Sequence, residues 1–137
     1  MLEWADRLAI RQTSHRAWRT HGVPLVAASA VRFDCQTGVF VPRVPTSPCY
    51  ACLFPPDAPP EETRCALMGV FAPVVGMMGV MQAGEAIKLL TGLHEPGVPG
   101  HHQSLAGRRL LLDGRDWSGT TGRACLSPDC PVCGPAT

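Results

Sequence analysis

The chain has 137 residues and a net charge of +1, with 45% hydrophobic and 17% charged residues. This length allows one domain with a real core, and the composition is typical of a globular rather than a disordered chain. The near-neutral charge and the scattered arginines give no electrostatic basis for binding nucleic acid or an anionic membrane, so both partners are disfavoured.

The N-terminal part is expected to hold one helix and one hairpin. Large side chains recur at spacings of three and four over residues 4–21, which predicts a helix ended by Gly22. The apolar runs 24–33 and 37–41 predict two strands, with the turn of the hairpin at Asp34–Gln36.

The remaining part is expected to hold a long helix and one strand. Seven prolines in residues 42–64 predict a loop. Residues 72–92 then predict a helix with a proline in its first turn and a glycine at its end. The uncharged stretch 65–84 contains proline and glycines and continues into charged residues, so we interpret it as a buried core helix and not a membrane span. After a loop over 93–107, a strand is expected over 108–114, and then a polar, turn-rich C-terminal segment. The fold class is α/β.

The N-terminal stretch MLEWADRLAIRQ lacks the basic-then-apolar pattern of a secretory signal. We therefore expect a cytoplasmic location. In that reducing compartment, seven cysteines are not expected to form disulfides.

Four of the cysteines form two C-x-x-C pairs at distant points of the chain. Cys49 and Cys52 lie in SPCYACLFP, whereas Cys130 and Cys133 lie in PDCPVCG. Tetrahedral zinc takes four such thiolates, and a short turn lets both sulfurs of a pair reach one ion. We predict a structural zinc site that fastens the C-terminal segment to the loop after the hairpin. The alternatives are a redox dithiol or four buried thiols, although neither pair lies at the strand-to-helix junction of a thioredoxin-like motif.

The other three cysteines and one histidine pair are further candidates for site residues. Cys65, in ETRCALMG, lies beside an arginine that favours its thiolate form, which makes it a candidate nucleophile against the alternative of an ordinary thiol. Cys35 and Cys125 are interpreted as ordinary thiols. His101 and His102 lie in a loop rich in glycine and proline, and we interpret them as solvated side chains instead of metal ligands.

Six stretches together resemble one known family: DRLAIR, GVPLVAASAVRFDCQTGVF, SPCYACLFP, CALMGVFAPVVGMMGVMQAGEAIKLLTG, LLLDG and PDCPVCG. They run from about residue 6 to residue 134 and are similar to the second half of the ubiquitin-activating-like adenylyltransferases of the ThiF/MoeB type. The resemblance implies that residues 1–137 form part of a Rossmann-type domain, with a mixed sheet, flanking helices and a structural zinc.

The resemblance also implies an activity. Such enzymes use ATP and magnesium to adenylate the C-terminal glycine of a ubiquitin-like sulfur-carrier protein that ends in Gly-Gly, and they release pyrophosphate. The resemblance places Asp6 opposite the metal and the ATP phosphates, and it makes Cys65 the crossover-loop cysteine that can attack the acyl-adenylate. It further implies a homodimer, for which the methionines and small residues of 68–84 can form a close-packed face.

The chain departs from this family pattern in several respects. The family's nucleotide-binding half holds phosphates on a G-x-G turn, whereas these 137 residues contain no G-x-G. Arg7 and His15 stand where asparagines are usual, and Leu67 stands where an acidic residue is frequent. Three explanations fit: a truncated gene, a split enzyme whose other half is a separate chain, or a degenerate relative kept for docking.

Two other classes of function stay open from the residues alone. One is a non-catalytic, zinc-stabilised module that docks a ubiquitin-like protein or a full-length paralogue, which the missing phosphate turn favours. The other is a zinc or dithiol redox protein. Molybdenum-cofactor, thiamine and tRNA-thiolation pathways are all compatible with the motifs.

Overall fold

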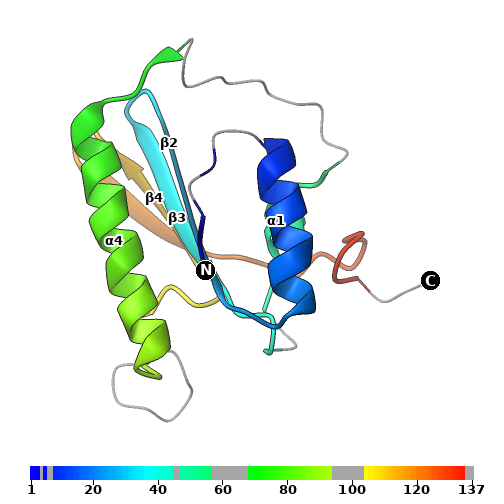
Figure 1. The fold of residues 1–137 in the computed structure, drawn as a ribbon. Helices are drawn as coiled ribbons and strands as arrows, with labels where there is room; N and C mark the ends of the chain where they lie inside the picture. The colour runs from blue at the N-terminus through cyan, green and yellow to red at the C-terminus, as the bar shows by residue number, and fades with distance from the viewer. Residues whose placement is uncertain (4, 6–7, 45–46, 57–67, 94–103, 135–137) are drawn as a thin grey trace.

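The computed structural model describes the chain except for residues 4, 6–7, 45–46, 57–67, 94–103 and 135–137. A five-stranded sheet lies between two helices, with α4 on one face and α1 on the other (Figure 1). The expected class, a mixed α/β sheet with flanking helices, is confirmed.

The elements follow one another in a simple order. They are β1 (Leu2–Glu3), α1 (Leu8–Thr20), β2 (Leu25–Val31), β3 (Asp34–Phe40), α2 (Tyr50–Leu53), α4 (Ala72–Leu90), β4 (Arg108–Asp113) and β5 (Ser118–Arg123). The strands lie in the sheet in their sequence order. β1 runs parallel to β2, and each later strand is antiparallel to the one before it.

Side chains alternate between the two faces of β2 and β3, so each face builds its own core. The core under α4 comprises Ala28, Ala30, Cys35, Val74 and Met78. The core under α1 comprises Trp18, Leu25, Ala27, Phe40 and Tyr50. Both helices are therefore held by apolar contact with the same central pair of strands.

Glycines end both long helices, as expected. After α4, Gly92 has a φ of 77°, the Gly92 N–H donates to the Leu89 carbonyl and the Leu93 N–H donates to the Lys88 carbonyl. The same pattern follows α1, where Gly22 has a φ of 64°. A glycine in this left-handed conformation lets the N–H groups that follow a helix donate hydrogen bonds to the last carbonyls of that helix. None of the described helices combines the length and the hydropathy needed to cross a membrane.

The helix expected over 4–21 is described as α1 from Leu8 to Thr20, and Leu2–Glu3, just before the expected helix, pair with Val26–Ala27 as β1. Two tertiary features hold this backbone extended. The Glu3 carboxylate accepts the Ala5 N–H at 2.7 Å, and the Gln82 side-chain amide of α4 donates to the carbonyls of Glu3 and Val26, both at 3.1 Å.

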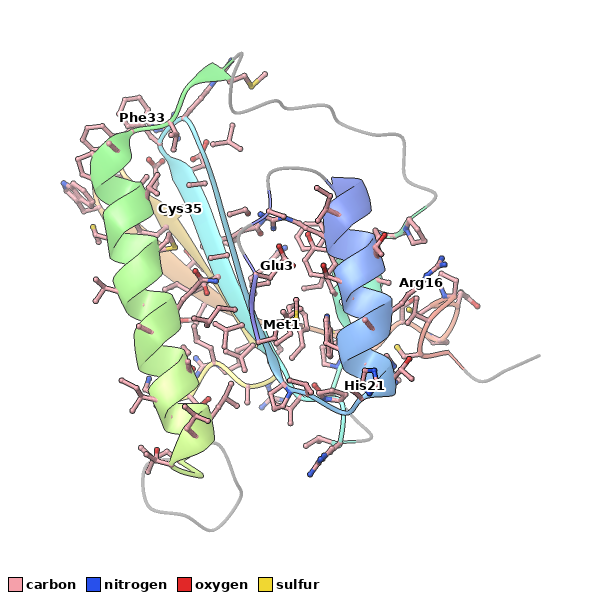
Figure 2. All side chains as sticks on the ribbon, in the orientation of Figure 1. Met1, Glu3, Arg16, His21, Phe33 and Cys35 are labelled. Atoms are coloured by element: carbon pink, nitrogen blue, oxygen red, sulfur yellow. The ribbon has the colours of Figure 1, made fainter. Side chains whose placement is uncertain are left out.

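The hairpin turn lies at Arg32–Phe33, so the expected turn at Asp34–Gln36 is wrong: Asp34 already begins β3, opposite Val31. The turn is supported from the segment before α4. The Arg32 N–H donates to the Gly69 carbonyl at 3.0 Å, and the Phe71 N–H donates to the Arg32 carbonyl at 2.7 Å. Figure 2 shows Phe33 at the tip of this hairpin.

Cys35, expected in the turn, lies in β3 on the face toward α4 (Figure 2). Its side chain is buried, and its thiol donates to the Leu112 carbonyl. Burial raises the pKa of this thiol, and the charges of Asp34 and Asp113 raise it further. These surroundings fit an unreactive thiol.

The C-terminal segment, expected to be turn-rich, contains the additional strand β5. All six of its residues are exposed, and it pairs with β4 along its whole length. Because both of its faces are exposed, its side chains show no apolar alternation, and only backbone pairing marks it as a strand.

Candidate functional site

The two C-x-x-C pairs meet at one point of the structure. The sulfur atoms of Cys49, Cys52, Cys130 and Cys133 all lie within 4.8 Å of one another. The shortest separations are 3.2 Å between Cys52 and Cys133, 3.5 Å between Cys49 and Cys130, and 3.7 Å between Cys49 and Cys52. The cluster thus joins the α2 turn to a segment 81 residues further along the chain.

Short turns orient both pairs. Cys49 caps α2, where its carbonyl accepts the Cys52 N–H at 3.1 Å and its own N–H donates to the Cys52 sulfur at 3.4 Å. In the second pair, the Gly134 N–H donates to the Cys130 carbonyl at 2.8 Å. A Cβ at position 134 would lie 2.6 Å from the carbonyl oxygens of Pro128 and Cys130, so this turn requires glycine.

The thiols differ in their tendency to ionise. Burial raises the pKa of Cys49, and its hydrogen bonds with Cys133 and Cys130 raise it further. Burial, with the hydrogen bond to Cys52, raises the pKa of Cys133 to about 11. At Cys130, burial is outweighed by the N–H groups of Val132 and Cys133, which lower the pKa to about 7. A bound cation would supply the positive charge that the other thiolates need.

The arrangement suits zinc. Four sulfurs placed tetrahedrally around zinc, each at about 2.3 Å, lie about 3.8 Å from one another. The closest separations here, 3.2 to 3.7 Å, approach that spacing. Four thiolates leave no open ligand position, which is typical of a structural site. The structure brings the four predicted ligands together, and the identity of their metal stays a prediction.

α2 connects this cluster to the core under α1. Tyr50 lies between the two cysteines of the first pair and is buried. Its ring lies 6.0 Å from those of His15 and Phe40 and 4.7 Å from that of Phe54. The Arg11 guanidinium approaches its hydroxyl at 3.4 Å. The turn that holds the cysteines therefore also positions Tyr50.

An open concavity lies between α1, α2 and the face of the sheet that α1 covers, and its empty space of about 270 Å³ includes volume open to solvent. Its described lining is Arg11, Ala27, Ala28, Ser29, Gln36, Thr37, Gly38, Phe40, Tyr50, Leu53, Phe54 and Arg109. An apolar concavity with a few polar groups is typical of a ligand site. The lining contains two guanidinium groups and no carboxylate, so the pocket favours an anionic ligand.

The two arginines of the pocket differ. Arg11 is fixed by bonds from its guanidinium to the carbonyls of Ala5 and Ala28 and to the Tyr50 hydroxyl. The backbone of Arg109 pairs with Gly38 and Gly122, whereas its guanidinium has no hydrogen bond or ion pair with any residue that the structure describes. Among the described residues, none occupies the guanidinium donors of Arg109.

The remaining predicted site residues, Asp6 and Cys65, lie outside the described residues, as do His101 and His102. Sequence reasoning missed the pocket, because its lining comes from separate helices and strands. The signal that could have found Arg109 is the strand register, which aligns Ala27, Gly38 and Arg109 in one row across the sheet.

A mixed sheet covered by a helix on each face, a four-cysteine cluster that anchors the C-terminal segment, and a pocket lined by two arginines define an α/β domain. The chain belongs to the ThiF family, whose model matches residues 2–132. The family resemblance of the sequence is thereby confirmed.

Individual relatives agree with this assignment. The chain is 39% identical over 134 residues to the sulfur carrier protein ThiS adenylyltransferase of Escherichia coli K12, covering 98% of this chain and 49% of that protein. It is 36% identical over 136 residues to the SAMP-activating enzyme of Haloferax volcanii, covering 98% of this chain and 46% of that protein. The chain thus spans about half the length of these relatives.

Solved structures show the same fold. The crystal structure of E. coli MccB matches 99% of this chain and 39% of its own, with a TM-score of 0.71 and 20% sequence identity. The heterocyclase TruD matches 97% of this chain and 22% of its own, with a TM-score of 0.69 and 16% identity. At these identities the likeness concerns the fold.

Proposed function

We propose that this chain is the zinc-bearing and tail-binding part of an enzyme that adenylates the C-terminal glycine of a ubiquitin-like sulfur-carrier protein. In this proposal a nucleotide-binding half supplies the glycine-rich phosphate turn. The observation that carries the proposal is the match to the ThiF family over residues 2–132, together with relatives named as sulfur carrier adenylyltransferases.

The proposed reaction activates a carboxylate. A carboxylate oxygen of the carrier tail attacks the α-phosphorus of ATP, so that a phosphorus–oxygen bond forms, the α–β anhydride bond breaks and pyrophosphate leaves. Adenylation replaces a poor leaving group, the carboxylate oxygen, by AMP. The Cys65 thiolate would then attack the acyl carbon and release AMP. Asp6 would face the metal-bound phosphates.

The described residues would perform the binding. The apolar wall of the pocket would hold the carrier tail in an extended form, and its arginines would orient negative charge. A zinc ion held by the four cysteines would keep α2, and with it Tyr50, in place at the edge of the pocket. We further propose that the chain acts as a homodimer in a reducing cytoplasm, where its thiols stay available as ligands.

Isotope exchange between ATP and labelled pyrophosphate tests this function. The assay uses a Gly-Gly-ended carrier protein, with the chain alone and with the chain plus a nucleotide-binding half of the same family. We expect exchange only in the second condition, and none with a carrier that lacks its last glycine. Absence of exchange in both conditions would refute the proposal.

The absence of any G-x-G turn in the 137 residues favours one alternative, a non-catalytic module that docks a ubiquitin-like protein or a full-length paralogue. Carrier binding without exchange, even when the nucleotide-binding half is present, would support this alternative. Carrier binding accompanied by exchange would reject it.

A further inference from the structure

We propose that Arg109 is a specificity-determining residue, which pairs with an acidic side chain of the carrier tail upstream of its terminal Gly-Gly. The inference rests on the proposed function, in which the pocket takes that tail. It goes beyond it by assigning a sequence requirement to the tail and a recognition role to one residue.

The charge of the pocket is the first argument. Its described lining holds the guanidinium groups of Arg11 and Arg109 and no carboxylate. Arg11 is already bonded to two main-chain carbonyls and a tyrosine hydroxyl. The carboxylates of Asp34 and Asp113 lie four residues away along β3 and β4, and both pair with Arg115. A planar guanidinium with open donors favours a carboxylate, which it can bind through two hydrogen bonds.

The space around Arg109 is the second argument. Its cross-strand neighbours are Gly38 on β3 and Gly122 on β5, and neither has a side chain to cover it. A Cβ at Gly122 would meet no atom within 4 Å, whereas a Cβ at Gly38 would lie 3.6 Å from the Phe40 ring. Arg109 therefore lies between two residues that have no side chain, and the Phe40 ring lies near one of them. This arrangement leaves room for a side chain of a ligand.

The register of the sheet gives the face on which Arg109 lies. The pairing runs across four strands in the order Glu3, Ala27, Gly38 and Arg109. Ala27 belongs to the core under α1. Because residues paired across a sheet point to the same face, the Arg109 side chain lies on the face that carries the pocket.

The test measures the binding of dansylated peptides to the whole chain by fluorescence anisotropy. The parent peptide is dansyl-Ala-Glu-Ala-Ala-Gly-Gly; a second peptide has glutamine in place of glutamate, and a third ends in a carboxamide. We expect the wild-type chain to bind the glutamate peptide about fivefold more tightly than the glutamine peptide. Arg109→Gln should remove this preference.

Two variants serve as controls. Arg123→Gln removes the same charge from an exposed residue of β5 that does not line the pocket, and it should keep the preference. Arg109→Lys keeps the positive charge, so it should keep part of the preference for the glutamate peptide. This result would show that the loss in Arg109→Gln reflects the missing charge and not a misfolded chain.

The proposal is overturned if Arg109→Gln retains the preference, or if the wild-type chain binds none of the peptides. It is also overturned if Arg109→Gln instead removes discrimination between the carboxylate and carboxamide ends, because the terminal group would then be the one recognised. An intact preference without pyrophosphate exchange would reject the proposed activity and leave this binding role standing.

Discussion

His15 is a fully buried imidazole on α1. Its ring lies 5.1 Å from that of Trp18 and 6.0 Å from that of Tyr50, and neither ring nitrogen has a hydrogen-bond partner among the described residues. Burial, assisted by the charges of Arg19 and Arg16, lowers the pKa of His15 to about 4. The imidazole is held neutral because a charge there would have neither water nor a partner.

This lowered pKa predicts a loss of stability in mild acid. The ordinary pKa of histidine is 6.5 and the folded value is about 4, so the unfolded state binds more protons between these values. The stabilisation is complete above the ordinary pKa and is lost as the pH falls toward the folded one. Between pH 7 and pH 5 the loss amounts to about 2 kcal/mol, which urea unfolding at both pH values can measure.

His15→Gln is the control for this prediction, because it removes the titrating ring and keeps the cysteines, whose protonation also depends on pH. The change in unfolding free energy between pH 7 and pH 5 should be smaller in the variant by about 2 kcal/mol. If the unfolding free energy changes equally in the wild-type chain and in His15→Gln, folding does not lower the pKa of His15.

At the scale of elements, the local sequence predicted the ends of the two long helices but neither the position of the hairpin turn nor the strand β5. The ends of α1 and α4 were predictable because Gly22 and Gly92 adopt the left-handed conformation that glycine favours. The hairpin turn was misplaced because main-chain bonds from Gly69 and Phe71, distant in sequence, support it. β5 was missed because its exposed residues carry no apolar pattern.

Two glycines should respond to alanine in opposite directions. Gly92 has a φ of 77°, where a Cβ costs about 1–2 kcal/mol, so Gly92→Ala should destabilise the chain. Gly79 lies inside α4 and an added Cβ there meets nothing within 4 Å, so Gly79→Ala should stabilise it by about 0.5–1 kcal/mol. Thermal unfolding measures the direction in which each substitution shifts the midpoint temperature. Each variant serves as the control for the other. Shifts of the midpoint in the same direction would contradict this account of α4.

At the scale of the whole molecule, the sequence allowed prediction of the four clustered cysteines and the family, and not of the pocket. Each C-x-x-C spacing is a short-range pattern that can be recognised before the fold is known. The lining of the pocket instead depends on which side chains of β2, β3 and β4 face α1. That choice follows from the strand register, since a one-residue shift would exchange the two faces. The register begins at the Arg32–Phe33 turn, which the sequence pattern placed elsewhere.

Metal binding at the cysteine cluster should stabilise the whole chain, because it joins segments 81 residues apart. Closing a loop of this length removes entropy from the unfolded chain worth about 4.5 kcal/mol. We expect elemental analysis to find one zinc ion per purified chain. Removal of the ion by a strong chelator, or the Cys130→Ser substitution, should lower the free energy of unfolding by about 4.5 kcal/mol, measured with urea.

Cys125→Ser is the matched control, because Cys125 is exposed and lies outside the cluster. This variant should keep both the zinc and the stability of the wild-type chain. Tyr50 lies between two of the ligands and lines the pocket, so loss of the metal should also weaken the binding of the glutamate peptide, whereas Cys125→Ser should not. If Cys130→Ser and Cys125→Ser carry equal metal and unfold alike, the four sulfurs do not hold an ion, and the position of α2 must depend on its aromatic contacts alone.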